Sequence, residues 1–319
     1  MQIPRPGARV AAALLALAAG GAFGQGFPTK PIRIVTSEPG SGTDLVARLT
    51  AQGLTDSLGR PVIVENRGGM LSGDVVLRAA PDGHTLLLAG TSLWLAPFMR
   101  ENVSYDPLRD FLPITLAGSS PNVLVIHPSL PVKSVRDLIA LARSRPGELN
   151  YGSGSTGAPT HLAAELFKAM AGVDIVRVPY KGTGPAINAL IAGQVQVMFV
   201  SATTAVPLVV SGRLNALAVA TARPSALAPG LPTLTASGLP GYEATSLFAV
   251  FAPVRTPAAI IQQLNQEIVR VLGKAEVKER LLKSGVEAVG SSPEELGATI
   301  KSDMTRWGRL IKAAGIRHE

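Results

Sequence analysis

Short apolar runs of strand length alternate with amphipathic runs of helical length along most of this chain. The strand-like runs lie at 32–36, 62–64, 85–89, 112–116, 123–126, 175–178, 195–200, 214–220 and 247–252. The helical patterns lie at 43–58, 134–144, 159–171, 183–192, 257–272 and 293–313. Strands that alternate with helices form βαβ units, in which helices flank a parallel sheet. The alternation therefore predicts an α/β fold with mainly parallel sheets.

The first strand runs into a Gly-rich turn that suits an anion. In the stretch 32–48, IRIVTSEPGSGTDLVAR, a strand is followed by a break and then by the start of a helix. Small residues allow a ligand to approach the backbone, while the first N–H groups of a helix lack intrahelical partners and carry the positive end of its dipole. Ser41 and Asp44, at the S-x-x-D spacing, can equally cap the helix with no ligand present. Both roles stay open for the candidates Gly40, Ser41, Gly42, Thr43 and Asp44.

The same arrangement occurs a second time, about one domain further along. A short strand at 149–151 runs into GSGSTG, and Pro159 follows in what would be the first turn of a helix, where its missing N–H costs nothing. Ligands of α/β proteins bind beyond the carboxyl ends of parallel strands, so two such turns in two lobes could face each other across a cleft. Candidate ligand-binding residues here are Ser153, Ser155, Thr156, Gly157, Thr160 and His161, joined at other strand ends by Thr91, Ser92 and Ser201.

Other site motifs are weak or absent from the sequence. Gly152, Gly154 and Gly157 satisfy G-x-G-x-x-G. In a dinucleotide-binding site, however, the acidic residue lies at the end of the next strand, whereas Asp174 lies before that strand. The sequence contains no G-x-x-x-x-G-K-[ST] loop, no G-x-S-x-G elbow and no H-E-x-x-H, and its four His are scattered. We therefore expect no catalytic residue, no metal and no cofactor.

The amino terminus predicts export. Arg5 and Arg9 precede an apolar run at 10–19, and Ala22-Phe23-Gly24 is a small-x-small site, so we expect a signal peptide at 1–24 that is cleaved after Gly24. Removing it leaves 295 residues and lowers the formal net charge from +8 to +6. The basic residues are spread without a run or stripe, which argues against nucleic-acid binding. The chain has no Cys, and it is expected to be soluble and periplasmic.

A series of ordered motifs across the mature chain resembles the Bug-type substrate-binding proteins of tripartite tricarboxylate transporters. They include PGSGTDLVAR, VIVENRGG, APDGHTLLLAG, PGELNYGSGSTGAPTHLAAELF and VPYKGTGPAINALIAGQV. The resemblance implies a type II periplasmic-binding fold whose two lobes hold a small carboxylate in a cleft. It places lobe 1 at 25–124 and 246–319 and lobe 2 at 125–245, with crossings near 121–128 and 241–253. It also implies a monomer that delivers its ligand to membrane transporter subunits.

Two residues depart from the family's pattern near the expected pocket: Glu38 in the first turn and Val200 after Met198-Phe199. Glu38 either faces solvent or points into the cleft, where it would disfavour a dianion. Two rival functions stay open beside capture of an anion. One is an exported enzyme that uses Asp44 or His161 as acid or base, and the other is a sensory module that presents its liganded lobe to a receptor.

Overall fold

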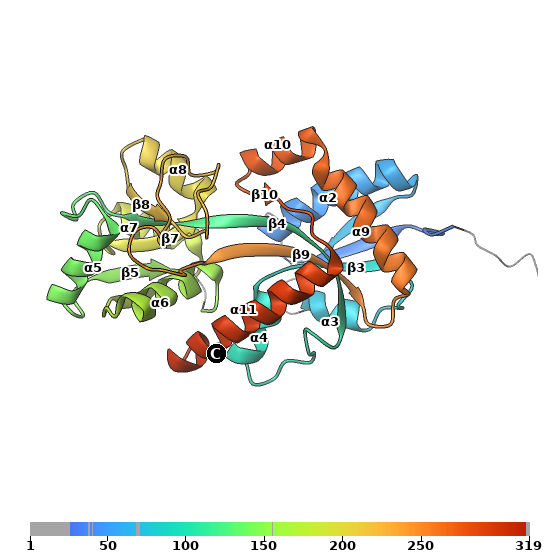
Figure 1. Ribbon diagram of the computed structural model, residues 1–319, viewed down its shortest axis with the longest axis horizontal. Helices are drawn as coiled ribbons and strands as arrows, with labels where there is room; N and C mark the ends of the chain where they lie inside the picture. The colour runs from blue at the N-terminus through green and yellow to red at the C-terminus, as the bar shows by residue number, and fades with distance from the viewer. Residues whose placement is uncertain (1–25, 38, 40, 68–70, 155, 317–319) are drawn as a thin grey trace, which may run out of the picture.

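Two lobes lie end to end and are joined by two long strands (Figure 1). The computed structural model describes residues 26–316 with the exception of 38, 40, 68–70 and 155. For Thr203 it describes the backbone and not the side chain. The proposed signal peptide and the candidates Glu38, Gly40 and Ser155 therefore lie outside the described residues. Within the described part of the chain, no helix has the length and apolar character that crossing a membrane requires.

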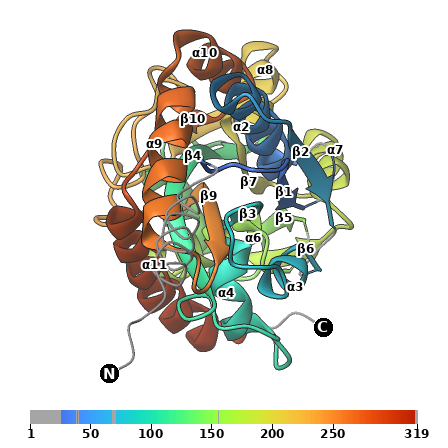
Figure 2. The ribbon, with the colours of Figure 1, turned by 90° about the vertical axis from the view of Figure 1, so that its right-hand side faces the viewer.

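The first lobe is a sheet covered by helices on both faces (Figure 2). Its strand order is β2-β1-β3-β9-β4, and β1 is parallel to both β2 and β3. Its strands are β1 (Ile32–Thr36), β2 (Val62–Asn66), β3 (Thr85–Gly90), β9 (Thr245–Pro253) and the first part of β4 (Phe111–Ile126), with β10 (Glu287–Ala288) paired to β4. Its helices are α2 (Gly42–Leu58), α3 (Leu71–Leu77), α4 (Ser92–Met99), α9 (Ala258–Gly273), α10 (Ala275–Lys283) and α11 (Pro293–Ala313).

Successive side chains of β3 serve opposite faces of this sheet. Leu86 and Leu88 belong to the core beneath α2, α9 and α10, whereas Leu87 and Ala89 belong to the core beneath α3, α4 and α11. A strand buried on both faces needs a continuous apolar run, because its side chains alternate between the faces. The run TLLLA in the sequence meets this requirement.

The second lobe repeats the plan at smaller size. It contains β5 (Asn150–Ser153), β6 (Val176–Pro179), β7 (Val197–Ser201) and β8 (Asn215–Val219), with α5 (Val135–Ser144), α6 (Pro159–Ala171), α7 (Thr183–Ile191) and α8 (Ala202–Val210). β5 is parallel to β6 and β7. Phe199 of β7 packs in one core with α6, while Met198 and Val200 pack in the other with α7 and α8. Val200 is fully buried in that second core.

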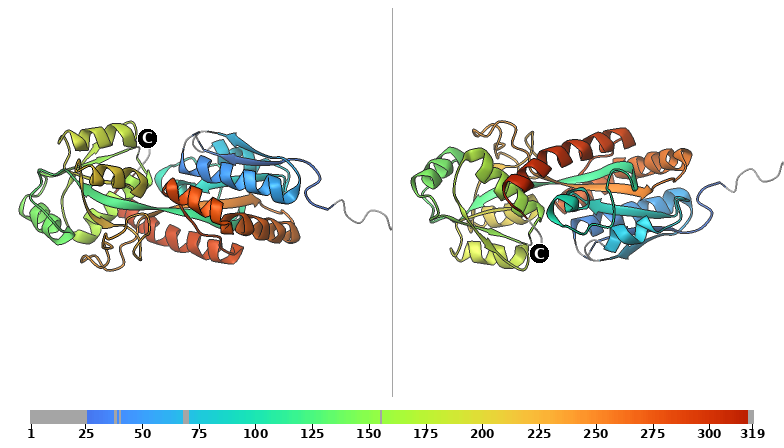
Figure 3. Two further views of the ribbon diagram at one scale, coloured as in Figure 1. Left: turned by 90° about the horizontal axis from the view of Figure 1, so that it is seen from above. Right: turned by 90° about the horizontal axis from the view of Figure 1, so that it is seen from below.

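The two lobes are joined through β4 and β9, as the views from above and below also show (Figure 3). Residues 111–121 of β4 pair antiparallel with β9, and residues 122–126 pair antiparallel with β7 and β8. The sequence suggested two runs, at 112–116 and 123–126, separated by a break. They form one 16-residue strand because β9 pairs with it along 111–121 and β7 and β8 pair with it along 122–126.

The expected parallel character holds for three strands in each lobe. The crossing strand β9 is antiparallel to β3 and β4, and β4 is antiparallel to β7 and β8, so the sheets are mixed. Helices α3, α4, α8 and α10 were not predicted. α4 and α8 are short and apolar all round, and each contains a Pro, so neither shows the 3.6-residue alternation that marks a helix in sequence.

Helix α11 lies along both lobes, packed against α4 of the first and α6 of the second (Figure 1). A capping box formed by Ser292 and Glu295 begins it. Trp94 of α4 donates its indole N–H to buried Asp303 of α11, with 3.3 Å between Nε1 and Oδ2. The helix therefore supports the region where the lobes meet.

Candidate functional site

A cavity of about 460 Å³ lies where the two Gly-rich turns meet, and residues of both lobes line it. The first lobe contributes the turn before α2, the end of β3 and α4, and the second contributes the turn before α6. The crossing strand β9 forms the remaining wall. The lining residues are Ser37, Ser41, Gly42, Thr43, Ser72, Leu88, Ala89, Gly90, Thr91, Ser92, Leu93, Ala96, Met99, Arg100, Tyr105, Thr156, Gly157, Ala158, Pro159, Ser246, Leu247 and Phe248.

Three hydroxyl groups gather at the first turn. Ser37 Oγ lies 3.0 Å from Ser41 Oγ, Ser41 Oγ lies 2.9 Å from Thr43 Oγ1, and Ser37 also hydrogen-bonds Thr43. Ser41 is the N-cap of α2 and accepts the backbone N–H of Asp44 at 3.2 Å. The capping role is thus real, and it coexists with a cluster of small donors at the positive end of a 17-residue helix.

Gly42 leaves space for an aromatic side chain of the protein itself. A Cβ at this position would lie 2.8 Å from Cζ of Phe248, on β9. Phe248 in turn forms part of the cavity wall. The absence of a side chain at Gly42 therefore allows β9 to approach the first turn of α2.

Asp44 supports the first turn from behind the cavity. Its side chain accepts Arg48 Nε at 3.0 Å and Asn66 Nδ2 at 2.8 Å, and it forms an ion pair with Arg48. The residue is 4% exposed and is not part of the cavity lining. Its carboxylate therefore links α2 to the end of β2, and the structure does not place it against a ligand.

The second turn is organised by Arg177 of β6, which the sequence reasoning missed. Its guanidinium donates to Ser153 Oγ at 2.8 Å, to Thr156 Oγ1 at 3.1 Å and to the carbonyl of Gly154 at 3.2 Å. Ser153 is fully buried, so its hydroxyl serves the turn and not the cavity. Only the pairing of β5 with β6 brings Arg177 beside this turn, and no local pattern signals that pairing.

His161 also acts within the turn. Its Nδ1 accepts the backbone N–H of Gly157 at 3.0 Å, and the residue is 3% exposed. Burial, and secondarily the charge of Arg177, lower the pKa of His161 to about 4. The imidazole is therefore neutral at pH 7 and fixes the Gly157 backbone, and it does not line the cavity.

The lobes touch at Gly157. Its φ of +76° is left-handed, and a Cβ there would lie 2.5 Å from the sulfur of Met99 on α4. A residue with a side chain would be strained in this conformation and would also displace Met99. This close approach joins the second turn to the first lobe.

The comparisons with known proteins agree with this geometry. The sequence profile of the "Tripartite tricarboxylate transporter family receptor" matches residues 46–316. The chain belongs to this family. BugT of Bordetella pertussis is 36% identical to the receptor over 297 residues, which cover 91% of each protein. The R. palustris protein Rpa4515 with adipate is 35% identical with a TM-score of 0.79, and the match covers 92% of this chain and 100% of that one. MatC from Rhodopseudomonas palustris with bound malate is 30% identical with a TM-score of 0.75, and the match covers 89% of this chain and 100% of MatC.

The receptor's cavity contains about half of the residues that the sequence suggested. Thr91 lies in the lining, where its Oγ1 accepts the N–H of Leu247 at 3.2 Å and ties α4 to β9. The lining includes Ser41, Gly42, Thr43, Thr91, Ser92, Thr156 and Gly157, and it does not include Asp44, Ser153, Thr160, His161 or Ser201. Met99, Arg100, Tyr105 and Phe248 line it without having been predicted. They come from α4, the loop after it and β9, which meet only in the folded protein.

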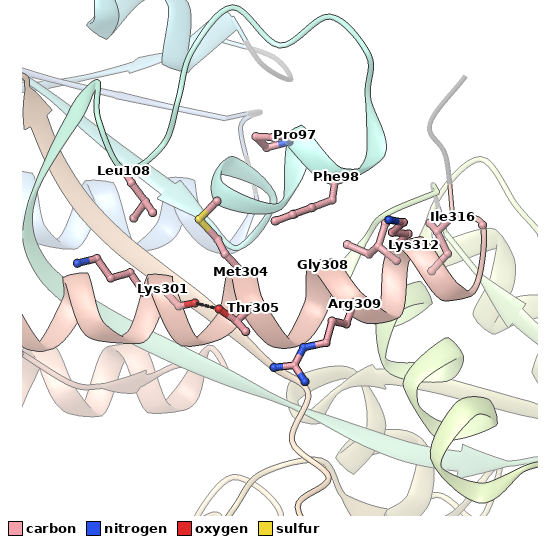
Figure 4. A pocket seen from close by; sticks show the side chains of 12 residues that line it. Pro97, Phe98, Leu108, Lys301, Met304, Thr305, Gly308, Arg309, Lys312 and Ile316 are labelled. Carbon is pink, nitrogen blue, oxygen red and sulfur yellow. Dashed lines mark hydrogen bonds between the residues drawn. The ribbon is translucent and has the colours of Figure 1, made fainter.

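A larger hollow of about 890 Å³ lies elsewhere, between α4 and the carboxyl-terminal half of α11 (Figure 4). Phe98 and Pro97 line it from α4, while Lys301 and Met304 line it from α11. No described residue of either Gly-rich turn lines it. The smaller cavity between the lobes, which both turns line, is therefore the candidate ligand site.

Proposed function

We propose that this receptor captures a small carboxylate between its lobes and delivers it unchanged to membrane subunits of a tripartite tricarboxylate-type transporter. One observation carries the proposal: the cavity joins the hydroxyls of Ser37, Ser41 and Thr43, at the amino end of α2, with Thr156 from the other lobe. Donors of this kind favour a carboxylate. Among the described lining residues there is no Asp or Glu to repel it.

The relatives support this class of ligand. Solved structures that cover about nine-tenths of this chain are named for adipate in one case and for malate in another. Both ligands are small dicarboxylates. The transporter partner follows from the family, because its members are described as receptors of that transporter.

The rival proposal of an exported enzyme has little support. Asp44 is engaged by Arg48 and Asn66, and His161 accepts a backbone N–H through Nδ1. Neither side chain reaches the cavity lining, so neither is placed to exchange a proton with a ligand. We therefore propose that the protein binds without catalysis.

We further propose a monomer that is secreted to the periplasm after cleavage behind Gly24. The proposed lobes, 25–124 with 246–319 and 125–245, are supported by the change of strand partners along β4. Pro121 still pairs with Thr245 of β9, whereas Asn122 pairs with Ser201 of β7.

A ligand screen tests the proposed function. We expect dicarboxylates or monocarboxylates to raise the unfolding temperature of the mature protein, and calorimetry to give one site per chain. Mass spectrometry of the released ligand should show no chemical change. A product of altered mass would support the enzyme, and the absence of any shift across carboxylates would overturn the proposal. Capture of a receptor domain, but not of the transporter subunits, by the liganded protein would favour the sensory role.

A further inference from the structure

Among the described residues that line the cavity, one side chain is positively charged, and no described carboxylate forms an ion pair with it. Arg100, the residue after α4, is the single charged group among the described lining residues. It is exposed, and its guanidinium forms no ion pair with a carboxylate in the described part of the chain. The carboxyl end of α4 carries the negative end of the helix dipole, which disfavours an anion, and the charge of Arg100 offsets this effect.

A second positive group, Arg177, lies behind the part of the cavity wall that the second lobe forms. Arg177 donates to Thr156 Oγ1 at 3.1 Å, and no carboxylate within the described ranges forms an ion pair with it. Because the oxygen of Thr156 accepts from the guanidinium, its own hydroxyl hydrogen is left to donate to the cavity. A hydroxyl polarised in this way is a strong donor to an anion.

These two groups flank the same contact between the lobes. Arg100 follows Met99, Thr156 precedes Gly157, and Met99 packs directly on Gly157. Neighbouring Cα atoms are about 3.8 Å apart. An anionic group beside the Met99–Gly157 contact therefore lies within reach of Arg100 from one lobe and Thr156 from the other.

This position is separate from the hydroxyl cluster at the start of α2. The end of β3 approaches α2 there, since a Cβ at Gly90 would lie 3.6 Å from Cγ2 of Thr43. Helix α4 begins two residues later and spans 8 residues, which is about 12 Å. Between its ends the cavity wall is apolar and is formed by Leu93, Ala96 and Met99, with Leu247 and Phe248 opposite.

We propose that Arg100 and the Arg177-supported Thr156 form a second anion subsite, and that the receptor selects a linear dicarboxylate whose methylene chain lies along α4. This inference rests on the proposed function, because it assigns the first carboxylate to the turn before α2. The second carboxylate touches both lobes, so the subsite also couples recognition of that group to the contact between them.

Matched ligand pairs test the subsite. Calorimetry would compare dicarboxylates of four to eight carbons with monocarboxylates of equal length, such as adipate with hexanoate. We expect the wild type to bind the best dicarboxylate roughly ten- to hundredfold more tightly than its monocarboxylate partner, as for one charged hydrogen-bonding contact. Arg100→Gln should remove most of this difference and leave monocarboxylate affinity within about twofold.

Control variants separate charge from structure. Arg60→Gln makes the same change in net charge at an exposed position outside the cavity and should keep the preference. Thr156→Val should weaken dicarboxylates while Thr156→Ser restores them. The second subsite alone would be overturned if the wild type bound dicarboxylates and monocarboxylates with equal affinity. It would also be overturned if Arg100→Gln weakened both ligand series by the same factor. If neither series binds, the proposed function itself fails.

Discussion

The neutral imidazole of His161 makes the stability of this receptor depend on pH. In the native state the pKa of His161 is lowered to about 4, chiefly by burial, whereas an unfolded His titrates near its ordinary value of 6.5. Between these values the unfolded chain binds a proton that the native protein does not bind. The contribution of His161 to stability is therefore fully present above pH 6.5 and is lost as the pH falls towards 4.

The magnitude follows from the two pKa values. A difference of about 2.5 units corresponds to about 3 kcal/mol between neutral pH and pH 4, of which about 2 kcal/mol is lost by pH 5. Protonation would also place a hydrogen on Nδ1, which now accepts the N–H of Gly157 at 3.0 Å. Protonation of His161 should therefore destabilise the second Gly-rich turn in particular.

Denaturant unfolding at pH 7.5, 6, 5 and 4.5 measures the effect. His161→Gln removes the titrating group, so its unfolding free energy should fall by about 2 kcal/mol less than that of the wild type between pH 7.5 and 5. His127→Gln is the control, because His127 lies outside the cavity and, among the described residues, its imidazole hydrogen-bonds only Ser129. The reasoning is refuted if His161→Gln and the wild type lose stability in parallel over this range.

Three further experiments have expected outcomes. Gly157→Ala should lower the unfolding free energy by about 1 kcal/mol or more, because the backbone of Gly157 is left-handed and the new Cβ would clash with Met99. Adding Met99→Ala to this variant should recover the part of the loss that the clash causes, as measured by denaturant unfolding. Asp44→Ala should lower the unfolding free energy by about 2 kcal/mol and change ligand affinity less than twofold in calorimetry, because the carboxylate is bonded behind the cavity. Ser292→Ala removes the N-cap of α11 and should cost about 1 kcal/mol in the same unfolding assay.

Each of these outcomes can fail in a recognisable way. Additive costs of Gly157→Ala and Met99→Ala would show that the two residues do not contact each other. A large loss of affinity in Asp44→Ala at unchanged stability would return that carboxylate to the ligand. An unchanged unfolding free energy in Ser292→Ala would mean that Glu295 alone begins the helix.

Local sequence patterns account for most of the strands and helices and for the chemistry of the turns. The apolar run TLLLA identifies β3 as a strand buried on both faces, and the S-x-x-D spacing identifies the cap of α2, because both signals act over a few residues. The same local reasoning found that the two Gly-rich turns are suited to anions. It could not decide which of their residues face a ligand.

That choice was made by tertiary structure. Asp44 and His161 are polar residues at the starts of helices, yet packing turns both behind the cavity, where Asn66 and Gly157 satisfy them. Arg177 is 21 residues from Thr156 along the chain, and it meets the second turn because β6 pairs with β5. Sequence predicted most strands, the amphipathic helices and the cap of α2, since these depend on neighbours along the chain. Only the fold decided that β4 is a single strand through both lobes and that Arg100 and Thr156 share one cavity, because strand pairing and lobe contact join residues whose separation in sequence carries no signal.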